Sequence, residues 1–175
     1  LASCIGSAAK QEAPPIERVP RDRDLPLSFA QQRLWFLDQL MPNNAFYNMP
    51  GAVRLKGRLN VAALEQTVSE IVRRHETLRT TFRSHAGEPI QVITEAQPIR
   101  FDVEDLSGLP IEAREAKAWQ LATEEAAKPF NLATGPVFRA RLLRLDAEDH
   151  VLLVCMHHIL SDGWSMGVLI HELTM

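Results

Sequence analysis

The feature that most constrains this 175-residue chain is an unbroken apolar run that ends in two histidines, HVLLVCMHH over residues 150–158. A strand that is apolar at almost every position is typical of the centre of a sheet that is covered on both faces. Because side chains alternate along a strand, His157 and His158 should point to opposite sides at its end. The run therefore predicts a central strand with one imidazole on each side of its last residues.

Helical and strand patterns alternate around this run. Apolar spacing predicts helices over 28–41, 60–75 and 109–128 and from Ser165 onward, and alternation predicts strands over 52–59, 77–82, 88–94 and 137–145. Ser28 with Gln31 forms a capping-box pattern, and Asn60 and Ser165 are expected N-caps. This mixture of helices and strands predicts an α/β fold, a two-layer sandwich with a mixed β-sheet and helices mainly on one face.

Composition excludes several classes of function. Apolar residues make up 46% and charged residues 23% of the chain, as in globular proteins. A net charge of −3 without runs of like charge argues against nucleic acid or an anionic membrane as the main partner. The chain has no apolar stretch of transmembrane length and no signal-peptide pattern. With only Cys4 and Cys155, it suits a reducing compartment, so we expect a cytoplasmic domain.

Residues 1–25 differ from the rest of the chain. They are rich in small, charged and proline residues and have little periodicity, which is typical of an interdomain linker. We therefore expect the folded domain to cover residues 26–175. The last predicted helix stops without a cap or a breaker, so we expect the chain to be cut from a larger protein.

The residues after the apolar run suggest two different chemistries. Residues 163–167, GWSMG, match the G-x-S-x-G pattern of serine hydrolases, with Ser165 as the nucleophile. However, residues 157–163 separate the strand from Trp164, whereas a nucleophile elbow leaves its strand directly. His171 and Glu172 lie on the same predicted helix as Ser165, where they cannot surround its hydroxyl as a triad would. The pattern therefore disfavours a hydrolase, which a fluorophosphonate probe would test.

The second chemistry is acyl transfer by a histidine, indicated by the pattern His-His-x-x-x-Asp-Gly over residues 157–163. Asp162 lies near the expected turn at Gly163, where a cation could pair with it and hold the loop and the imidazole in place. The N-terminus of the following helix disfavours an imidazolium, and a neutral imidazole is what a general base needs at pH 7. Cys155 and His157 share a strand face, but too few ligands accompany them, and no metal site is predicted.

Three separated stretches carry a resemblance to a known family. SFAQQRLWFLDQL (28–40), RHETLRTTF (74–82) and MHHILSDGWS (156–165) closely resemble the first three core motifs of condensation domains from nonribosomal peptide synthetases. The resemblance covers about residues 25–175. Condensation domains have two lobes similar to chloramphenicol acetyltransferase that form a V around a channel. They join an upstream aminoacyl or peptidyl thioester to the amino group of a downstream aminoacyl thioester, in the biosynthesis of antibiotics and other secondary metabolites.

The resemblance implies that residues 26–175 are the N-terminal, donor-side lobe, truncated after the histidine motif, and that this lobe alone is inactive. By motif match, His158 is the catalytic histidine, which positions or deprotonates the attacking amine. His157 is implied to be structural, and Asp162 to be an ion-pair partner rather than an acid or base. Gly163 would allow close backbone approach near the reacting thioester.

The other two motifs contribute three arginines. Arg33 and Arg79 are both candidates for the partner of Asp162, and the sequence does not choose between them. Arg74 suits a cation at the end of a surface helix as well as it suits a role in the site.

The family also implies partners and alternatives. No cofactor is bound directly, because the substrates are tethered to phosphopantetheine on carrier-protein domains; the other implied partners are the C-terminal lobe and adjacent synthetase domains. The motifs look most like domains that accept an upstream L-amino acid. Heterocyclising relatives carry an aspartate in place of the first histidine, which His157 excludes. An epimerisation domain, in which His158 would move an α-proton, and a catalytically silent docking domain remain as alternatives.

Overall fold

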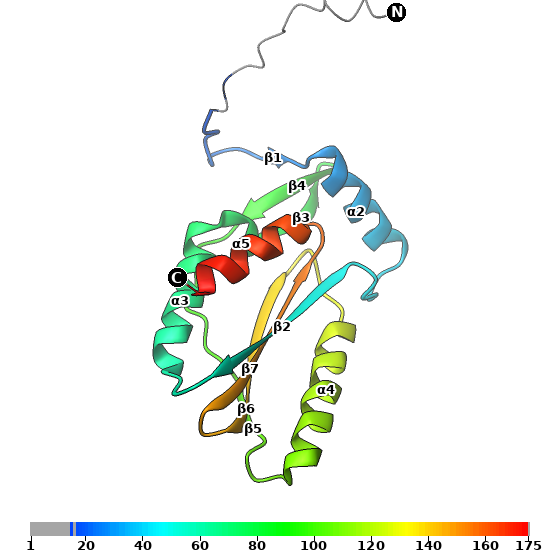
Figure 1. Cartoon of the computed structure of the whole chain (residues 1–175). Helices are drawn as coiled ribbons and strands as arrows, with labels where there is room; N and C mark the ends of the chain where they lie inside the picture. The colour runs from blue at the N-terminus through cyan, green and yellow to red at the C-terminus, as the bar shows by residue number, and fades with distance from the viewer. Residues whose placement is uncertain (1–14, 16, 175) are drawn as a thin grey trace, which may run out of the picture.

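The computed structural model describes residue 15 and residues 17–174. The helices lie around a central sheet of strands (Figure 1). In chain order the elements are β1 (Leu25–Pro26), α2 (Phe29–Leu40), β2 (Asn48–Lys56), α3 (Val61–Arg74), the 3₁₀ turn η1 (Glu76–Arg79), β3 (Thr80–His85), β4 (Glu88–Ile93), β5 (Val103–Asp105), α4 (Ile111–Ala127), β6 (Phe138–Asp146), β7 (Asp149–His157) and α5 (Gly163–Thr174).

The strands form a four-stranded sheet and a smaller three-stranded sheet. The larger sheet has the order β2-β7-β6-β5, in which β5 is parallel to β6 and the other pairs are antiparallel. The smaller sheet is antiparallel, with the order β1-β4-β3. Residues 152–157 of β7 are all buried between β2 and β6. The mixed sheet, the α/β class and the central position of the apolar run are therefore confirmed.

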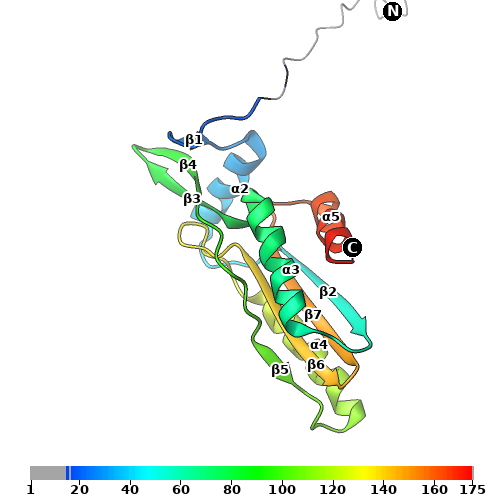
Figure 2. The same ribbon diagram turned by 90° about the vertical axis from the view of Figure 1, so that its left-hand side faces the viewer.

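Helices cover both faces of the larger sheet (Figures 1 and 2). On one face, α3 and α5 pack against the even-numbered side chains of β7, namely Leu152, Val154 and Met156. On the other face, Leu121 of α4 packs in a cluster with Leu143 and Leu153. The expectation of helices mainly on one face fits α3 and α5. The second face is also covered because the odd-numbered positions of β7 are apolar too and require burial.

Local signals place the first helix starts where the sequence predicts them. The Ser28 hydroxyl accepts the N–H of Gln31 at 3.2 Å, and the Gln31 side chain accepts the N–H of Ser28 at 2.9 Å, which completes the capping box at α2. The Asn60 side chain accepts the N–H of Ala63 at 3.1 Å at the start of α3. Both predicted N-caps are confirmed.

The predicted strand over 77–82 begins later than expected. Residues 76–79 form η1 instead, and the Thr80 hydroxyl donates to the carbonyl of Glu76 at 2.7 Å, closing that turn before β3 begins. The hairpin to β4 turns at Ala86 and Gly87, whose φ angles are 51° and 88°. Two consecutive residues with positive φ are what a two-residue hairpin turn requires.

The predicted linker, residues 1–25, lies mostly outside the described residues, as does Cys4. Its described end contacts the folded part. Arg21 forms an ion pair with Glu76 at 2.5 Å, and Leu25 pairs with Gln91 of β4. The linker boundary stays a prediction.

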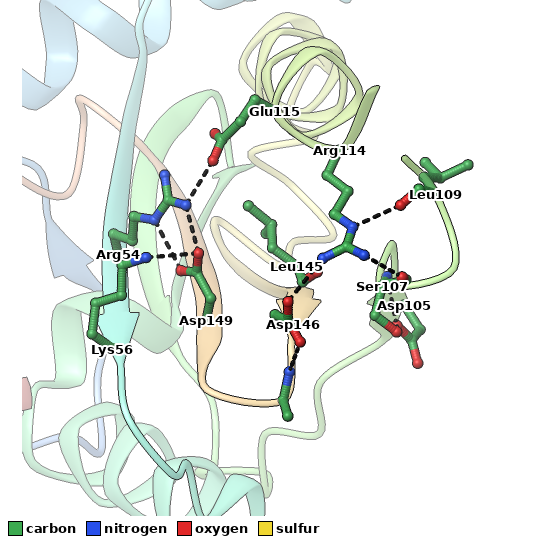
Figure 3. A network of polar contacts seen from close by, with 11 residues as sticks. Arg54, Lys56, Asp105, Ser107, Leu109, Arg114, Glu115, Leu145, Asp146 and Asp149 are labelled. Carbon is green, nitrogen blue, oxygen red and sulfur yellow. Dashed lines mark hydrogen bonds and ion pairs between the residues drawn. The ribbon is translucent and has the colours of Figure 1, made fainter. Parts of the chain in front are cut away.

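Ion pairs and backbone bonds hold the start of α4 to the sheet near the β6–β7 turn (Figure 3). Arg114 donates to the carbonyls of Ser107, Leu109 and Leu145 at 2.7–2.9 Å and to the carboxylate of Asp146 at 2.9 Å.

Within the described residues, no helix is long and apolar enough to cross a membrane.

Candidate active site

The site begins with His157, the last residue of β7, which is 3% exposed. Its ring packs edge-on against Phe130, with centroids 6.3 Å apart, and lies 6.1 Å from the ring of Tyr47. Its Nδ1 accepts the backbone N–H of Ile159 at 3.1 Å, which places the ring proton on Nε2. Burial, with a smaller contribution from His158, lowers the pKa of His157 to about 4. The buried imidazole is therefore neutral at pH 7.

His158 has the opposite environment, because it is exposed in the turn that follows β7. Its backbone N–H donates to the carbonyl of Tyr47 at 2.8 Å. Its Nδ1 lies 2.6 Å from the carbonyl oxygen of Ser161, which can only accept, so Nδ1 carries the proton. In the neutral form, Nε2 then carries the lone pair. This is the tautomer that a general base needs.

Asp162 caps the helix that follows the turn. Its Oδ1 accepts the N–H of Ser165 at 2.9 Å and the hydroxyl of Ser165 at 2.8 Å. These two hydrogen bonds hold the pKa of Asp162 below its usual value. The predicted N-cap at Ser165 is therefore wrong. Because Asp162 lies directly before the first helical residue, Gly163, its carboxylate reaches the free N–H groups of the first turn.

The same contacts give no support to a Ser165 nucleophile. The hydroxyl of Ser165 donates to a carboxylate on its own helix turn rather than to a histidine. Glu172 faces away from it and bonds to Nε2 of His75 at 2.9 Å, with Arg74 3.6 Å from its other oxygen. Arg74 therefore joins the end of α3 to α5.

The structure does not bring the other two arginines of the motifs to Asp162. Arg79 donates to the carbonyl of Thr94 and lies 3.9 Å from Glu76, so it holds η1 against the end of β4. Arg33 is exposed on α2. Among the described residues, Asp162 forms no ion pair, and the predicted pairing with Arg33 or Arg79 is not formed. The carboxylate faces the first turn of α5 instead.

Gly163 and a small cavity complete the surroundings of His158. Among the described residues, a Cβ at Gly163 would meet nothing within 4 Å apart from its chain neighbours and the backbone of its own helix. A cavity of about 200 Å³ lies between the end of α3, η1 and the start of α5. Its lining includes His75, Thr77, Leu160, Ser161, Trp164 and Val168. Ser161 therefore borders the cavity and also bonds His158.

Sequence reasoning did not single out Tyr47, Phe130 or Ser161, although all three contact the histidines. Tyr47 is the only tyrosine in the chain, and this was the one available signal. Phe130 and Tyr47 approach His157 from distant parts of the sequence, and no local pattern encodes such contacts.

Comparisons with known proteins show the family to which the chain belongs. The family model of the condensation domain matches residues 21–175. The chain is 55% identical over 159 residues to one of the linear gramicidin synthase proteins of Brevibacillus parabrevis, a match that covers 91% of this chain and 2% of that synthase. It is 42% identical over 169 residues to phosphinothricin tripeptide synthetase PhsC of Streptomyces viridochromogenes, covering 96% of this chain and 16% of that protein.

Solved structures show the same architecture. The X-domain from teicoplanin biosynthesis superposes with a TM-score of 0.80 and 34% identity, covering 91% of this chain and 33% of the X-domain chain. The starter condensation domain of rhizomide synthetase RzmA superposes with a TM-score of 0.77 and 25% identity, covering 87% and 36% of the two chains. The chain belongs to the condensation-domain family, and it spans about a third of these solved relatives.

Proposed function

We propose that this chain is the N-terminal, donor-side lobe of an amide-bond-forming condensation domain in a nonribosomal peptide synthetase. The observation that carries the proposal is the hydrogen bond from Nδ1 of the exposed His158 to the carbonyl of Ser161, which makes Nε2 the nitrogen with the lone pair in the neutral ring. Membership of the family and the similarity to peptide synthetases support the choice of reaction.

In the proposed reaction, the amine of a carrier-bound aminoacyl group attacks the carbonyl carbon of an upstream thioester. As the C–N bond forms, Nε2 of His158 accepts the proton that the nitrogen releases. The C–S bond then breaks, and the same proton passes to the departing thiolate of the phosphopantetheine arm. The Nδ1–H···O=C bond to Ser161 keeps the ring oriented and stabilises the imidazolium that forms in between.

The neighbouring residues have supporting roles in this proposal. His157 stays neutral and buried and holds the turn through Ile159. Asp162 caps α5 rather than acting as an acid or base. Gly163 leaves open space in this lobe, which supports the role of allowing a substrate arm or a second lobe to approach the backbone closely.

The proposed partners are carrier-protein domains with phosphopantetheine arms, the C-terminal lobe of the same domain and adjacent synthetase domains. The donor is proposed to be an L-amino acid, and the location cytoplasmic. We expect the 175-residue chain alone to be inactive, because it spans about a third of its solved relatives and supplies one wall of the channel. Turnover by the isolated chain would contradict this.

The test uses the complete condensation domain with donor and acceptor carriers loaded with aminoacyl groups. Peptide formed in a single turnover is measured by intact mass for the wild type, His158→Ala and His171→Ala. His171 is a matched control because it is an exposed histidine on α5. We expect His158→Ala to lower the rate by a factor of about 10² to 10⁴, the usual contribution of a general base, while His171→Ala leaves it unchanged. Full activity of His158→Ala would refute the proposed role.

One observation favours a second candidate, a docking domain without catalysis. The X-domain from teicoplanin biosynthesis, 34% identical to this chain, has been solved in a complex with OxyB. If docking is the function, the wild-type domain binds a partner protein but forms no peptide from loaded carriers. An epimerisation domain would instead incorporate solvent deuterium at the α-carbon of the carrier-bound residue without forming an amide.

A further inference from the structure

Arg139 of β6 contacts both the end of α4 and Phe130, the residue that packs against His157. Its side chain is 15% exposed and forms an ion pair with Glu125 of α4. The guanidinium also donates to the carbonyls of Glu125, Lys128 and Pro129, at 3.2, 2.8 and 3.4 Å. The last carbonyls of a helix have no partner within the helix. Arg139 therefore completes the end of α4 together with Asn48, whose side-chain amide donates to the carbonyls of Ala126 and Lys128 at 2.7 and 2.9 Å. Only a planar fork with several donors can make all of the bonds of Arg139 together.

The same guanidinium covers the ring of Phe130, in the loop after α4. Its central carbon lies 3.7 Å from the ring centroid, in the geometry of a cation–π contact. The edge contact of Phe130 with His157 is perpendicular, at 90°. Phe130 is 5% exposed, so the ring has little room to move. A continuous set of contacts therefore runs from the end of α4 through Arg139 and Phe130 to the buried histidine.

His157 in turn fixes the turn that carries His158. Its Nδ1 accepts the N–H of Ile159 at 3.1 Å, and its carbonyl accepts the N–H of Leu160 at 3.0 Å. A shift or rotation of the His157 ring would leave a buried N–H without an acceptor and release the turn. The position of the exposed imidazole thus depends on the ring packed behind it.

We propose that Arg139 is a positioning residue for His158, which it holds in place through Phe130 and His157. The effect on the reaction rate rests on the proposed function, whereas the effect on the two imidazoles does not. Burial, with a smaller contribution from His158, lowers the pKa of His157, and the rings of Phe130 and Tyr47 lie against the imidazole.

The test measures the imidazoles and the reaction separately. Three variants of the complete condensation domain are labelled with ¹⁵N-histidine: Arg139→Lys, Phe130→Leu and the control Arg141→Lys. Arg141 is on the same strand and pairs with Glu104 at 2.6 Å, away from His157. The ¹⁵N shifts of both histidines are followed against pH, and assignments come from His157→Gln and His158→Gln.

We expect Arg139→Lys and Phe130→Leu to raise the pKa of His157 from about 4 and to mix its two tautomers. The single-turnover rate should fall by a factor of between about 10 and 10², as expected when a catalytic group is misplaced by an ångström or less. Arg141→Lys should change neither quantity. The double variant Arg139→Lys/Phe130→Leu should lose no more activity than the more affected single variant, because Arg139 acts on His157 through Phe130.

Unchanged His157 shifts in both folded variants would overturn the positioning role, whatever happens to the rate. If Arg139→Lys fails to fold, Phe130→Leu decides the question alone, since it removes the ring and keeps an apolar side chain. If the wild type forms no peptide but the His157 changes occur as described, the proposed function fails and the positioning role stands.

Discussion

At the β6–β7 turn, charged side chains lie near the surface and share their partners. Arg54 bonds both Asp149 and Glu115, and Lys56 bonds Asp149 as well (Figure 3). At the opposite end of the same strand, His157 is buried among aromatic rings, and its ring accepts a hydrogen bond from a backbone N–H.

The two ends of β7 differ in how much the loss of one hydrogen bond or ion pair costs. Water and a second partner replace a lost bond in the charged network, so each exposed pair contributes little. At the histidine end, neither water nor an alternative partner can substitute, so a change in one side chain alters both stability and protonation. The C-terminal end of β7, where His157 is tightly packed, is also the end that His158 follows.

The largest expected contrast is in the response to pH. The folded state keeps the pKa of His157 at about 4, whereas in the unfolded chain it is near 6.5. The unfolded state therefore takes up the proton first as the pH falls. The stabilisation is complete above pH 6.5 and is lost as the pH falls towards 4, by about 3 kcal/mol in the free energy of unfolding.

Urea unfolding of the chain between pH 7 and pH 4.5 measures this loss. His157→Phe should flatten the pH dependence substantially, with a remaining slope from His150, whose pKa burial also lowers. Asp149 of the charged network contributes little in this range, because its pKa is about 2 in the folded state and about 3.9 in the unfolded chain, both below pH 4.5. The same slope in His157→Phe and wild type would show that the buried imidazole does not control acid stability.

At the other end, we expect Arg114 to matter more than Arg54. Arg114 is 18% exposed and donates to three backbone carbonyls, so Arg114→Met should lower the free energy of unfolding by about 2 kcal/mol. Arg54 is 42% exposed, so Arg54→Met should cost less than about 1 kcal/mol and less still at high salt. Equal losses in the two variants would mean that burial and bonds to backbone carbonyls do not set the cost of removing these arginines.

We expect a substitution at Gly163 to lower the reaction rate without lowering the stability of the lobe. An added methyl group meets no other element among the described residues, and alanine is the better helix former. Gly163→Ala should therefore leave the melting temperature unchanged or slightly higher, while the single-turnover rate of the complete domain falls by about tenfold or more. A lower melting temperature with normal activity would assign Gly163 to folding alone.

Sequence patterns predicted the parts of this molecule that depend on neighbouring residues. The apolar run became the central strand β7, and the capping patterns at Ser28 and Asn60 formed as expected. The N-cap of α5 was misplaced because Asp162 and Ser165 both suit that role, and the chain places Asp162 first.

The contacts that decide the chemistry come from distant segments. The pairing of β2, β6 and β7 brings Tyr47, Phe130 and Arg139 close to His157 or its neighbours. The expected ion pair between Asp162 and Arg33 or Arg79 is not formed among the described residues. The carboxylate of Asp162 bonds to Ser165 in the first turn of its own helix instead. The spacing of residues in the sequence does not show whether the Asp162 carboxylate binds an arginine or the start of its own helix.

The central claim is that two adjacent histidines hold opposite neutral tautomers, which leaves Nε2 of His158 free to accept a proton. The most direct measurement is the long-range ¹H–¹⁵N correlation spectrum of the wild-type domain at pH 7.5. The account predicts a protonated Nε2 on His157 and a protonated Nδ1 on His158. A His158 ring with its proton on Nε2, or the same tautomer on both rings, would contradict it.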